Sequence, residues 1–442
     1  MPVSDDVARM NDHYFAGQLS PAFLGKLASL PEDRADVHAI VDRLFRMMRR
    51  GGFGAADLSP SHGAFLGSMV ARVLPGAWGG RIPPITFADR HCKIDQYVTA
   101  NRWAPAAETG AFVDLGCGFP PLTTVETADH LPGWQVWGVD PLIPSYLLHD
   151  AGGNYAIFDA EQRAQYFQPV VPSPANWDAL LRDADATRSR FEALLREMAQ
   201  EASIGEQAPL TPIERAGARL LIDPVRHYRR DNLSFAVGSI ETAPLAEIDV
   251  VRCFNVLGYY DDPFRQRALA WFAGIMREGG LLLCGSNVGR SAACRYFVHQ
   301  KRGGRLVDRE FAFGIDNLCP HAVNPWYAQH EDDREVGLLM DLIRAVRSDA
   351  DFIARLLARN DALRAEYGIA PRQADGYYGE SDPSLLAWEL SDRAALIGER
   401  LAEEGYGEHA ATILREAGYD AWCNEIGHVA IGCEAGPMRT PA

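Results

Sequence analysis

Two aspartates and two glycines are spaced in this sequence as a ligand site would require. The segment DLGCG (114–118) follows an apolar run that begins at Ala111, and Asp140 ends a second apolar run 22 residues after Gly118. Glycines directly after a buried strand let the backbone turn sharply and approach a ligand. A carboxylate at the end of the neighbouring strand can accept hydrogen bonds from both hydroxyls of a ribose, each worth about 1.5–3 kcal/mol. The spacing therefore favours a nucleoside site.

These residues need a sheet that brings the two strand ends together. Five apolar runs of strand length occur in the sequence, and helical stretches separate them; the runs are AFVDL from Ala111, QVWGVD ending at Asp140, Leu233–Ser239, Ile248–Leu257 and Gly280–Asn287. Fully apolar strands that alternate with helices are typical of a parallel sheet with helices on both faces. Ligands bind such sheets at the carboxyl ends of the strands, which is where DLGCG and Asp140 lie.

The same segments carry a family resemblance. FVDLGCGF resembles motif I of class I S-adenosylmethionine (SAM)-dependent methyltransferases, and VWGVD resembles their motif II. The resemblance implies an α/β fold with a Rossmann-like, seven-stranded, mostly parallel sheet, and SAM as the cofactor. It implies that Gly116 and Gly118 border the methionine part of SAM and that Asp140 holds its ribose. The other residues that it places around the cofactor are Asp114, Cys117, Pro141, Gly238, Ser239, Ile240, Asn255 and Val256.

Two further short segments are similar to methyltransferases. Val237-Gly238-Ser239-Ile240 stands where the family contacts adenine, with Ser239 in place of the usual acidic residue. The stretch from the fourth to the fifth strand, with Cys253-Phe254-Asn255, is similar to chemotaxis-receptor methyltransferases, and implies that Asn255 faces SAM while Tyr259 or Tyr260 lines the acceptor pocket. The resemblance covers about 110–145 and 230–290.

The turn after the first strand departs from the family pattern. Where a third glycine is common, this chain has Phe119-Pro120-Pro121, followed by Thr123 and Thr124. The prolines remove two N–H donors, and we expect the threonine hydroxyls to cap the next helix. The missing glycine also counts against a nicotinamide site, where a pyrophosphate must approach the start of the helix.

The predicted function is methyl transfer from SAM to a small-molecule acceptor. Methyl transfer needs alignment and exclusion of water, and needs a base only when the acceptor holds a proton. Candidate catalytic residues are Tyr259, Tyr260 and His227, and Arg102 is a candidate partner for the carboxylate of SAM. Three alternatives stay open: a protein-carboxyl methyltransferase, a SAM-using cyclase or lyase, and a non-catalytic SAM-binding protein.

The parts outside the motifs divide the chain further. We expect a helical N-terminal cap at 1–105 and a SAM-binding core at 106–292. Within the core we expect a β-meander at 145–170 and a helical insertion at 171–228. A hairpin and helical insertion should cover 293–404, and a last helix with closing strands 405–442. The last two core strands are expected at 420–434, with the hairpin at 295–315 as the rival pair.

Composition narrows the class of protein. The net charge of −16 argues against a nucleic-acid partner, and no apolar stretch approaches the about 20 residues that cross a bilayer. The beginning of the sequence lacks the apolar core of a signal peptide, so a cytoplasmic location is expected. The eight cysteines include no CxxC pair and predict reduced thiols and no metal site, while a homodimer stays open.

Overall fold

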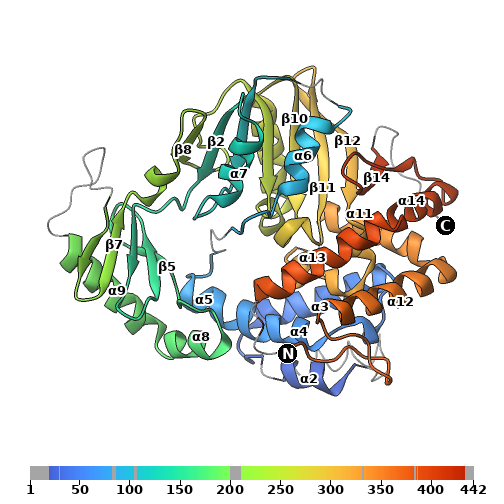
Figure 1. Cartoon of the computed structure of the whole chain (residues 1–442), viewed down its shortest axis with the longest axis horizontal. Coiled ribbons are helices and arrows are strands. Elements are labelled where there is room, and N and C mark those ends of the chain that lie inside the picture. The colour runs from blue at the N-terminus through green and yellow to red at the C-terminus, as the bar shows by residue number, and fades with distance from the viewer. Residues whose placement is uncertain are drawn as a thin grey trace.

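The computed structural model contains two β-sheets and several groups of helices (Figure 1). It describes residues 19–28, 30–81, 86–103, 107–199, 211–330, 333–382, 385 and 387–433. Parts of the predicted cap, helical insertion and C-terminal segment, at 1–18, 82–85, 104–105, 200–210 and 434–442, lie outside the described residues.

The larger sheet has nine strands in the order β13-β14-β12-β11-β10-β9-β1-β2-β8. Its strands are β1 (Ala111–Leu115), β2 (Gln135–Asp140), β8 (Leu233–Val237), β9 (Ile248–Phe254), β10 (Met276–Ser286), β11 (Arg295–Arg302), β12 (Arg305–Phe313), β13 (Ala421–Cys423) and β14 (Val429–Gly432). The five strands from β8 to β10 are parallel to one another. Their carboxyl ends form one edge, which we call the rim.

The parallel strands are buried on both faces, as their apolar sequences predict. Successive residues of β1 point to opposite sides, so Phe112 and Val113 belong to different hydrophobic clusters. The Phe112 cluster is covered by α6 (Cys92–Ala100) and α7 (Leu122–His130), and the Val113 cluster by α10 (Asp262–Ile275). The prediction of a Rossmann-like α/β fold with helices on both faces is therefore confirmed.

The number of strands was predicted wrongly, because both rival pairs belong to the sheet. The hairpin β11–β12 is not an insertion outside the sheet: β11 pairs antiparallel with β10, with Gly285 opposite Tyr296. Strand β14 then pairs with β12, and β13 forms the edge. A sequence pattern identifies a hairpin but not its neighbour in the sheet.

The smaller sheet is inserted between β2 and β8. Its five strands are antiparallel in the order β5-β4-β3-β7-β6; they are β3 (Tyr146–His149), β4 (Tyr155–Phe158), β5 (Ala164–Gln168), β6 (Ile213–Arg215) and β7 (Ala218–Ile222). The expected meander is β3–β5. Residues 171–228 are only partly helical, with α8 (Pro174–Leu181) and α9 (Ala184–Ala199), because β6 and β7 extend the meander through β3.

Helices from both ends of the chain share one hydrophobic cluster below the larger sheet in Figure 1. The apolar face predicted from Val37 to Met48 is buried in α3 (Ala35–Arg50), which ends at Gly51. The other helices of this cluster are α2 (Pro21–Leu27), α4 (Pro60–Phe65), α11 (Arg334–Arg347), α12 (Ala350–Glu366), α13 (Ala387–Glu403) and α14 (Tyr406–Glu416), with a π-helical stretch at Leu66–Val73. Helix α5 (Leu74–Ala77) packs instead in the hydrophobic cluster of the smaller sheet.

The position of the hairpin beside β10 can be tested at one glycine. A Cβ atom on Gly285 would overlap the carbonyl oxygen of Arg295 and would approach the Cβ of Tyr296 to 2.5 Å. We expect Gly285→Ala to lower the free energy of unfolding by about 1–3 kcal/mol in urea denaturation, because the two strands must separate. Gly274→Ala, in the open on α10, is the control and should raise it by about 0.5–1 kcal/mol. Equal effects of the two changes would contradict the pairing of β10 with β11.

Candidate functional site

The turn after β1 brings three strands of the rim together. Gly116 and Gly118 both have left-handed backbones, with φ of 81° and 67°. The Gly116 N–H donates to the carbonyl oxygen of Val139 at the end of β2, at 2.8 Å. A Cβ on Gly116 would overlap a methyl group of Val256, which follows β9. Glycine is therefore required at 116 both by conformation and by the approach of β9.

Asp140 closes this turn from the end of β2. Its carboxylate accepts hydrogen bonds from the Gly118 N–H at 3.1 Å and from the Leu142 N–H at 2.7 Å. Burial raises the pKa of Asp140 to about 6, and the two backbone donors oppose that rise. Each carboxylate oxygen accepts one of the two bonds and keeps lone pairs for another donor. The predicted pair of Gly118 and Asp140 is thus in direct contact.

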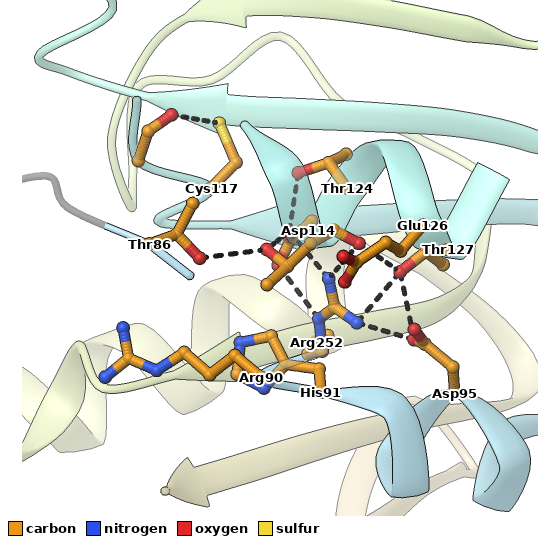
Figure 2. Close-up of polar contacts among 12 residues, drawn as sticks. Thr86, Arg90, His91, Asp95, Asp114, Cys117, Thr124, Glu126, Thr127 and Arg252 are labelled. Atoms are coloured by element: carbon orange, nitrogen blue, oxygen red, sulfur yellow. Dashed lines mark hydrogen bonds and ion pairs between the residues drawn. The ribbon is translucent and has the colours of Figure 1, made fainter. Parts of the chain in front are cut away.

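Asp114 faces the interior beneath the turn and is not directed at a ligand (Figure 2). Its two carboxylate oxygens accept from Nε and a terminal nitrogen of Arg252, at 3.0 and 2.7 Å. Arg252, on β9, has a fully buried side chain, and it also donates to Asp95 of α6 at 2.6 Å. This buried cluster, Arg252 with Asp95 and Asp114, joins β1, β9 and α6 directly below the rim.

The threonines of α7 complete this cluster. Thr124 donates to Asp114 at 2.7 Å, and Thr127 donates to Asp95 at 2.9 Å. The expectation that Thr123 and Thr124 cap α7 is wrong. Pro121 occupies the N-cap position, and no side-chain hydrogen bond caps the helix there. The hydroxyls serve the buried carboxylates instead, because these require donors away from water. Burial raises the pKa of Asp95 to about 6 against the opposing effect of Arg252.

Asn255 lies at the rim, but its carboxamide is used within the protein. Its Oδ1 accepts from the Ser286 hydroxyl at 3.2 Å and from the Asn287 N–H at 3.1 Å, and its Nδ2 donates to Asn287 Oδ1 at 3.1 Å. The backbone of Asn255 is left-handed, with φ of 59°. Asn287, directly after β10, therefore fixes the orientation that Asn255 presents at the rim.

Arg90 and His91, which precede α6, reach the same point. Asn287 Nδ2 donates to the Arg90 carbonyl oxygen at 2.8 Å and bonds with His91 Nδ1 at 3.0 Å. A terminal nitrogen of Arg90 donates to the Asn287 carbonyl oxygen at 3.2 Å. Burial lowers the pKa of His91 well below its usual value, and the nearby guanidinium groups of Arg252 and Arg90 lower it further. The imidazole is therefore neutral near pH 7.

The end of β8 provides the opposite side of the rim. The Gly238 N–H donates to the Asp140 carbonyl oxygen at 3.3 Å, so the predicted adenine segment does lie next to Asp140. The Ser239 hydroxyl is bonded to the Thr242 hydroxyl at 2.8 Å, and Ile240 is buried in the core. Val237 is 68% exposed, so the surface that this segment offers is apolar.

The three candidate catalytic side chains differ in their contacts and exposure. Tyr259 packs edge-to-face against Trp326 at 5.7 Å, and burial raises its pKa to about 12. Tyr260 is 43% exposed and stacks on Phe264 at 4.2 Å. His227 is exposed, one residue before Tyr228. Both tyrosines follow β9 and so lie beside the rim.

Two further predicted residues take other positions. Cys117 has a buried side chain, and burial together with Asp140 raises its thiol pKa well above the usual value. Pro141 is exposed beside Asp140. Neither side chain presents a reactive group at neutral pH.

Arg102 does not lie with the other predicted residues. Its guanidinium is 3.8 Å from the ring centroid of Trp422 on the edge strand β13. The neighbouring Trp103 carbonyl accepts from Gln300, which also bonds to Gly279 near the start of β10. Helix α6 begins at the rim and runs away from it, so residue 102 ends near the amino ends of the strands. Proximity in sequence to Asp114 misled the prediction.

The sequence reasoning missed three residues that shape the rim, namely Arg252, Asn287 and Arg90. An arginine within the apolar run of β9 was a signal for a buried ion pair, because arginine is almost never buried without a partner. Asn287 was recognised only as the end of a strand. The position of Arg90 depends on the packing of α6, for which the sequence gives no direct signal.

The described residues include no group of three His, Cys, Asp or Glu side chains placed to hold a metal ion. None of the helices that the structure describes is long and apolar enough to cross a bilayer.

Comparisons with known proteins give similarity at the level of structure. No protein-family model and no curated protein sequence matches the chain. Similar solved structures include an O-methyltransferase family 2 protein from Planctomyces limnophilus DSM 3776 in complex with apigenin, at 15% identity over 45% of this chain and 38% of that one, with a TM-score of 0.22. PKMT2 from Rickettsia typhi in complex with AdoHcy has 13% identity over 47% and 27%, with a TM-score of 0.23.

A coclaurine N-methyltransferase bound to N-methylheliamine and SAH is similar over 97% of this chain and 92% of that one, at 13% identity and a TM-score of 0.25. The chain spans less than half the length of the first two proteins.

The buried cluster yields a stability prediction. Arg252→Met would leave Asp95 and Asp114 buried without a cation, and we expect the free energy of unfolding to fall by about 3–5 kcal/mol in urea denaturation. Its loss should be smaller at about pH 5 than at about pH 8, because carboxylates left without a cation take up protons. The control is Arg277→Met, which removes exposed ion pairs with Glu247 and Asp249 and should cost at most about 1 kcal/mol. Equal losses in the two variants would contradict the role given to Arg252.

Proposed function

We propose that this chain binds SAM at the rim and transfers its methyl group to a small-molecule acceptor. One observation carries the proposal: the left-handed turn at Gly116 and Gly118 is bonded to Asp140 at the carboxyl ends of adjacent parallel strands. This is the edge of an α/β sheet where ligands bind, and the donor set suits a nucleoside.

The residues present fit the ribose part of SAM. Asp140 keeps lone pairs on both oxygens after accepting from Gly118 and Leu142, so it can accept from two ribose hydroxyls. The absence of a side chain at Gly116 lets β9 approach β1, and the backbone at this point can approach a ligand closely. Val237 offers an apolar surface for the adenine ring beside Gly238.

Arg90, rather than Arg102, supplies the cation for the methionine carboxylate in this proposal. Its guanidinium bonds to the carbonyl of Asn287 at the rim, between the end of β10 and the start of α6. Asp114, the acidic residue of the motif, is already paired with Arg252 below the rim. A guanidinium in this position can bind a carboxylate with two parallel hydrogen bonds.

The side chains around the rim are suited to hold an acceptor rather than to remove its proton. SAM supplies an electrophilic methyl group on a sulfonium, and an incoming atom displaces the sulfur in line. Tyr259, whose pKa burial raises to about 12, is protonated at neutral pH and can donate a hydrogen bond to the acceptor. Tyr260 offers an exposed aromatic face. These residues orient the acceptor and exclude water, which is the main contribution that methyl transfer needs.

Binding of SAM and its dependence on Asp140 test the proposal. We expect the purified chain to bind SAM in a calorimeter, and Asp140→Ala to weaken binding at least about tenfold, because two charge-assisted hydrogen bonds are lost. Unchanged affinity in that variant would remove Asp140 from the site, and absence of binding to the unmodified chain would remove the function.

The raised pKa of Asp140 predicts a pH dependence of binding. The carboxylate takes up a proton below about pH 6 and then loses its negative charge and part of its capacity to accept hydrogen bonds. SAM affinity should therefore fall as the pH is lowered from about 7.5 to about 5, with its midpoint near the pKa of Asp140. Asp140→Asn is the matched control, since it cannot titrate, and its weaker binding should change less over this range. Parallel pH curves for both proteins would contradict the assignment.

The reaction product separates methyl transfer from other uses of SAM. Methyl transfer leaves S-adenosylhomocysteine, whereas cyclisation or lysis of the methionine chain leaves 5′-methylthioadenosine. We expect only S-adenosylhomocysteine to accumulate when the protein is incubated with SAM and mixed acceptors and the products are identified by mass spectrometry. Accumulation of 5′-methylthioadenosine would favour the cyclase or lyase alternative.

A further inference from the structure

Asn287 uses every polar atom that it has, and all its partners lie at the rim. Its backbone N–H and its side-chain oxygen bond to the carboxamide of Asn255. Its side-chain nitrogen donates to the Arg90 carbonyl oxygen and to His91. Its own carbonyl oxygen accepts from the Arg90 guanidinium. The side chain is 3% exposed, so water contributes little to these bonds.

The segments that Asn287 joins have strained backbones. Asn255 is left-handed, and Arg290, Ser291 and Ala293, just beyond Asn287, have φ of 48°, 58° and 47°. Residues other than glycine adopt this conformation at a cost of about 1–2 kcal/mol each, and they keep it only where surrounding contacts enforce it. The Ser291 N–H donates to the same Arg90 carbonyl oxygen at 3.0 Å. The bonds centred on Asn287 are therefore among the contacts that hold this part of the rim, together with the bond from the Ala293 N–H to Asp316 at 2.6 Å.

Asn287 also selects the tautomer of His91. An asparagine Nδ2 can only donate, so His91 Nδ1 accepts and carries no proton. The neutral ring, whose edge-to-face partner is Phe254 at 5.3 Å, then has its proton on Nε2. A ring in this form donates from Nε2 and cannot remove a proton there. Two nearby cations, Arg90 and Arg252, face the same ring and disfavour a positive charge on it.

We propose that Asn287 is a positioning residue for the cofactor, which orients Asn255 and Arg90 and fixes the proton of His91 on Nε2. It does not touch the reacting atoms. It acts by connecting the end of β9 to the turn before α6, two segments that lie 165 residues apart in the chain at Asn255 and Arg90. This inference rests on the proposed function, because the rim that Asn287 organises is the proposed SAM site.

Removal of the Asn287 side chain tests this role against a matched control. Asn101 is the counterpart at the other end of α6: it is also buried, and its side chain bonds to the Tyr97 and Val98 carbonyl oxygens and to the Trp103 N–H. We expect Asn287→Ala to weaken SAM binding at least about tenfold in calorimetry, which is the size of effect that the loss of one good hydrogen bond produces. Asn101→Ala should bind SAM within about twofold of the unmodified chain, although both variants lose comparable hydrogen bonds and melt at lower temperature.

The outcomes separate the inference from the proposed function. If the unmodified chain does not bind SAM, the proposed function fails. If it binds SAM and Asn287→Ala binds equally well, or if Asn101→Ala weakens binding as much, the positioning role of Asn287 is overturned while the function stands.

A second variant covers the case in which Asn287→Ala does not fold. Asn287→Asp has the same shape and can still accept from Asn255 Nδ2, but it can no longer donate to the Arg90 carbonyl oxygen or to His91. We expect the His91 proton to move from Nε2 to Nδ1, where the new carboxylate accepts it, and we expect weaker SAM binding. Nitrogen NMR of the imidazole ring distinguishes the two tautomers in each protein. An unchanged tautomer in Asn287→Asp would refute the contact on which the inference depends.

Discussion

The buried pairing of Arg252 with Asp114 and Asp95 is the interaction on which the rest of the site depends. Removing three charged groups from water is costly, and their mutual attraction offsets that cost only when the geometry is close and the remaining lone pairs are bonded. Here the guanidinium bonds to both carboxylates, and Thr124 and Thr127 supply further donors. Few other arrangements of β1, β9, α6 and α7 satisfy these groups together.

This constraint explains how the motif after β1 works. Asp114 is the last charged residue before the glycines, and its carboxylate is anchored by β9 rather than exposed to a ligand. The turn at Gly116 and Gly118 therefore begins from a fixed point and reaches Asp140 across a short path. The buried charges below the rim therefore set the position of the backbone donors at the rim.

The sequence predicted the parallel half of the fold well because that half has a strong local signal. Apolar strands between helices, with DLGCG and Asp140 at their ends, leave few alternatives for the order of β1, β2, β8, β9 and β10. The antiparallel half was less predictable, because the sequence pattern of a hairpin is the same whichever strand of the sheet the hairpin pairs with. At the site, Gly118 and Asp140 could be paired from spacing alone. Arg90 and Asn287 could not, because their contact depends on how α6 packs against the sheet.

The smaller sheet has a consequence for how this molecule can vary. Its chain leaves the larger sheet after β2 and returns before β8, and the two ends meet, since the Asp223 N–H donates to the Ser145 carbonyl oxygen at 2.8 Å. The lobe enters and leaves the larger sheet at one place, but it also packs on the N-terminal helices, where Trp78 meets Trp177 edge-to-face and Val73 and Ala77 share its hydrophobic cluster. A short turn joining Ser145 to Asp223 would leave β2 and β8 in register, so the lobe can be lengthened without changing the larger sheet, whereas its deletion would expose the apolar side chains of the N-terminal helices that it covers.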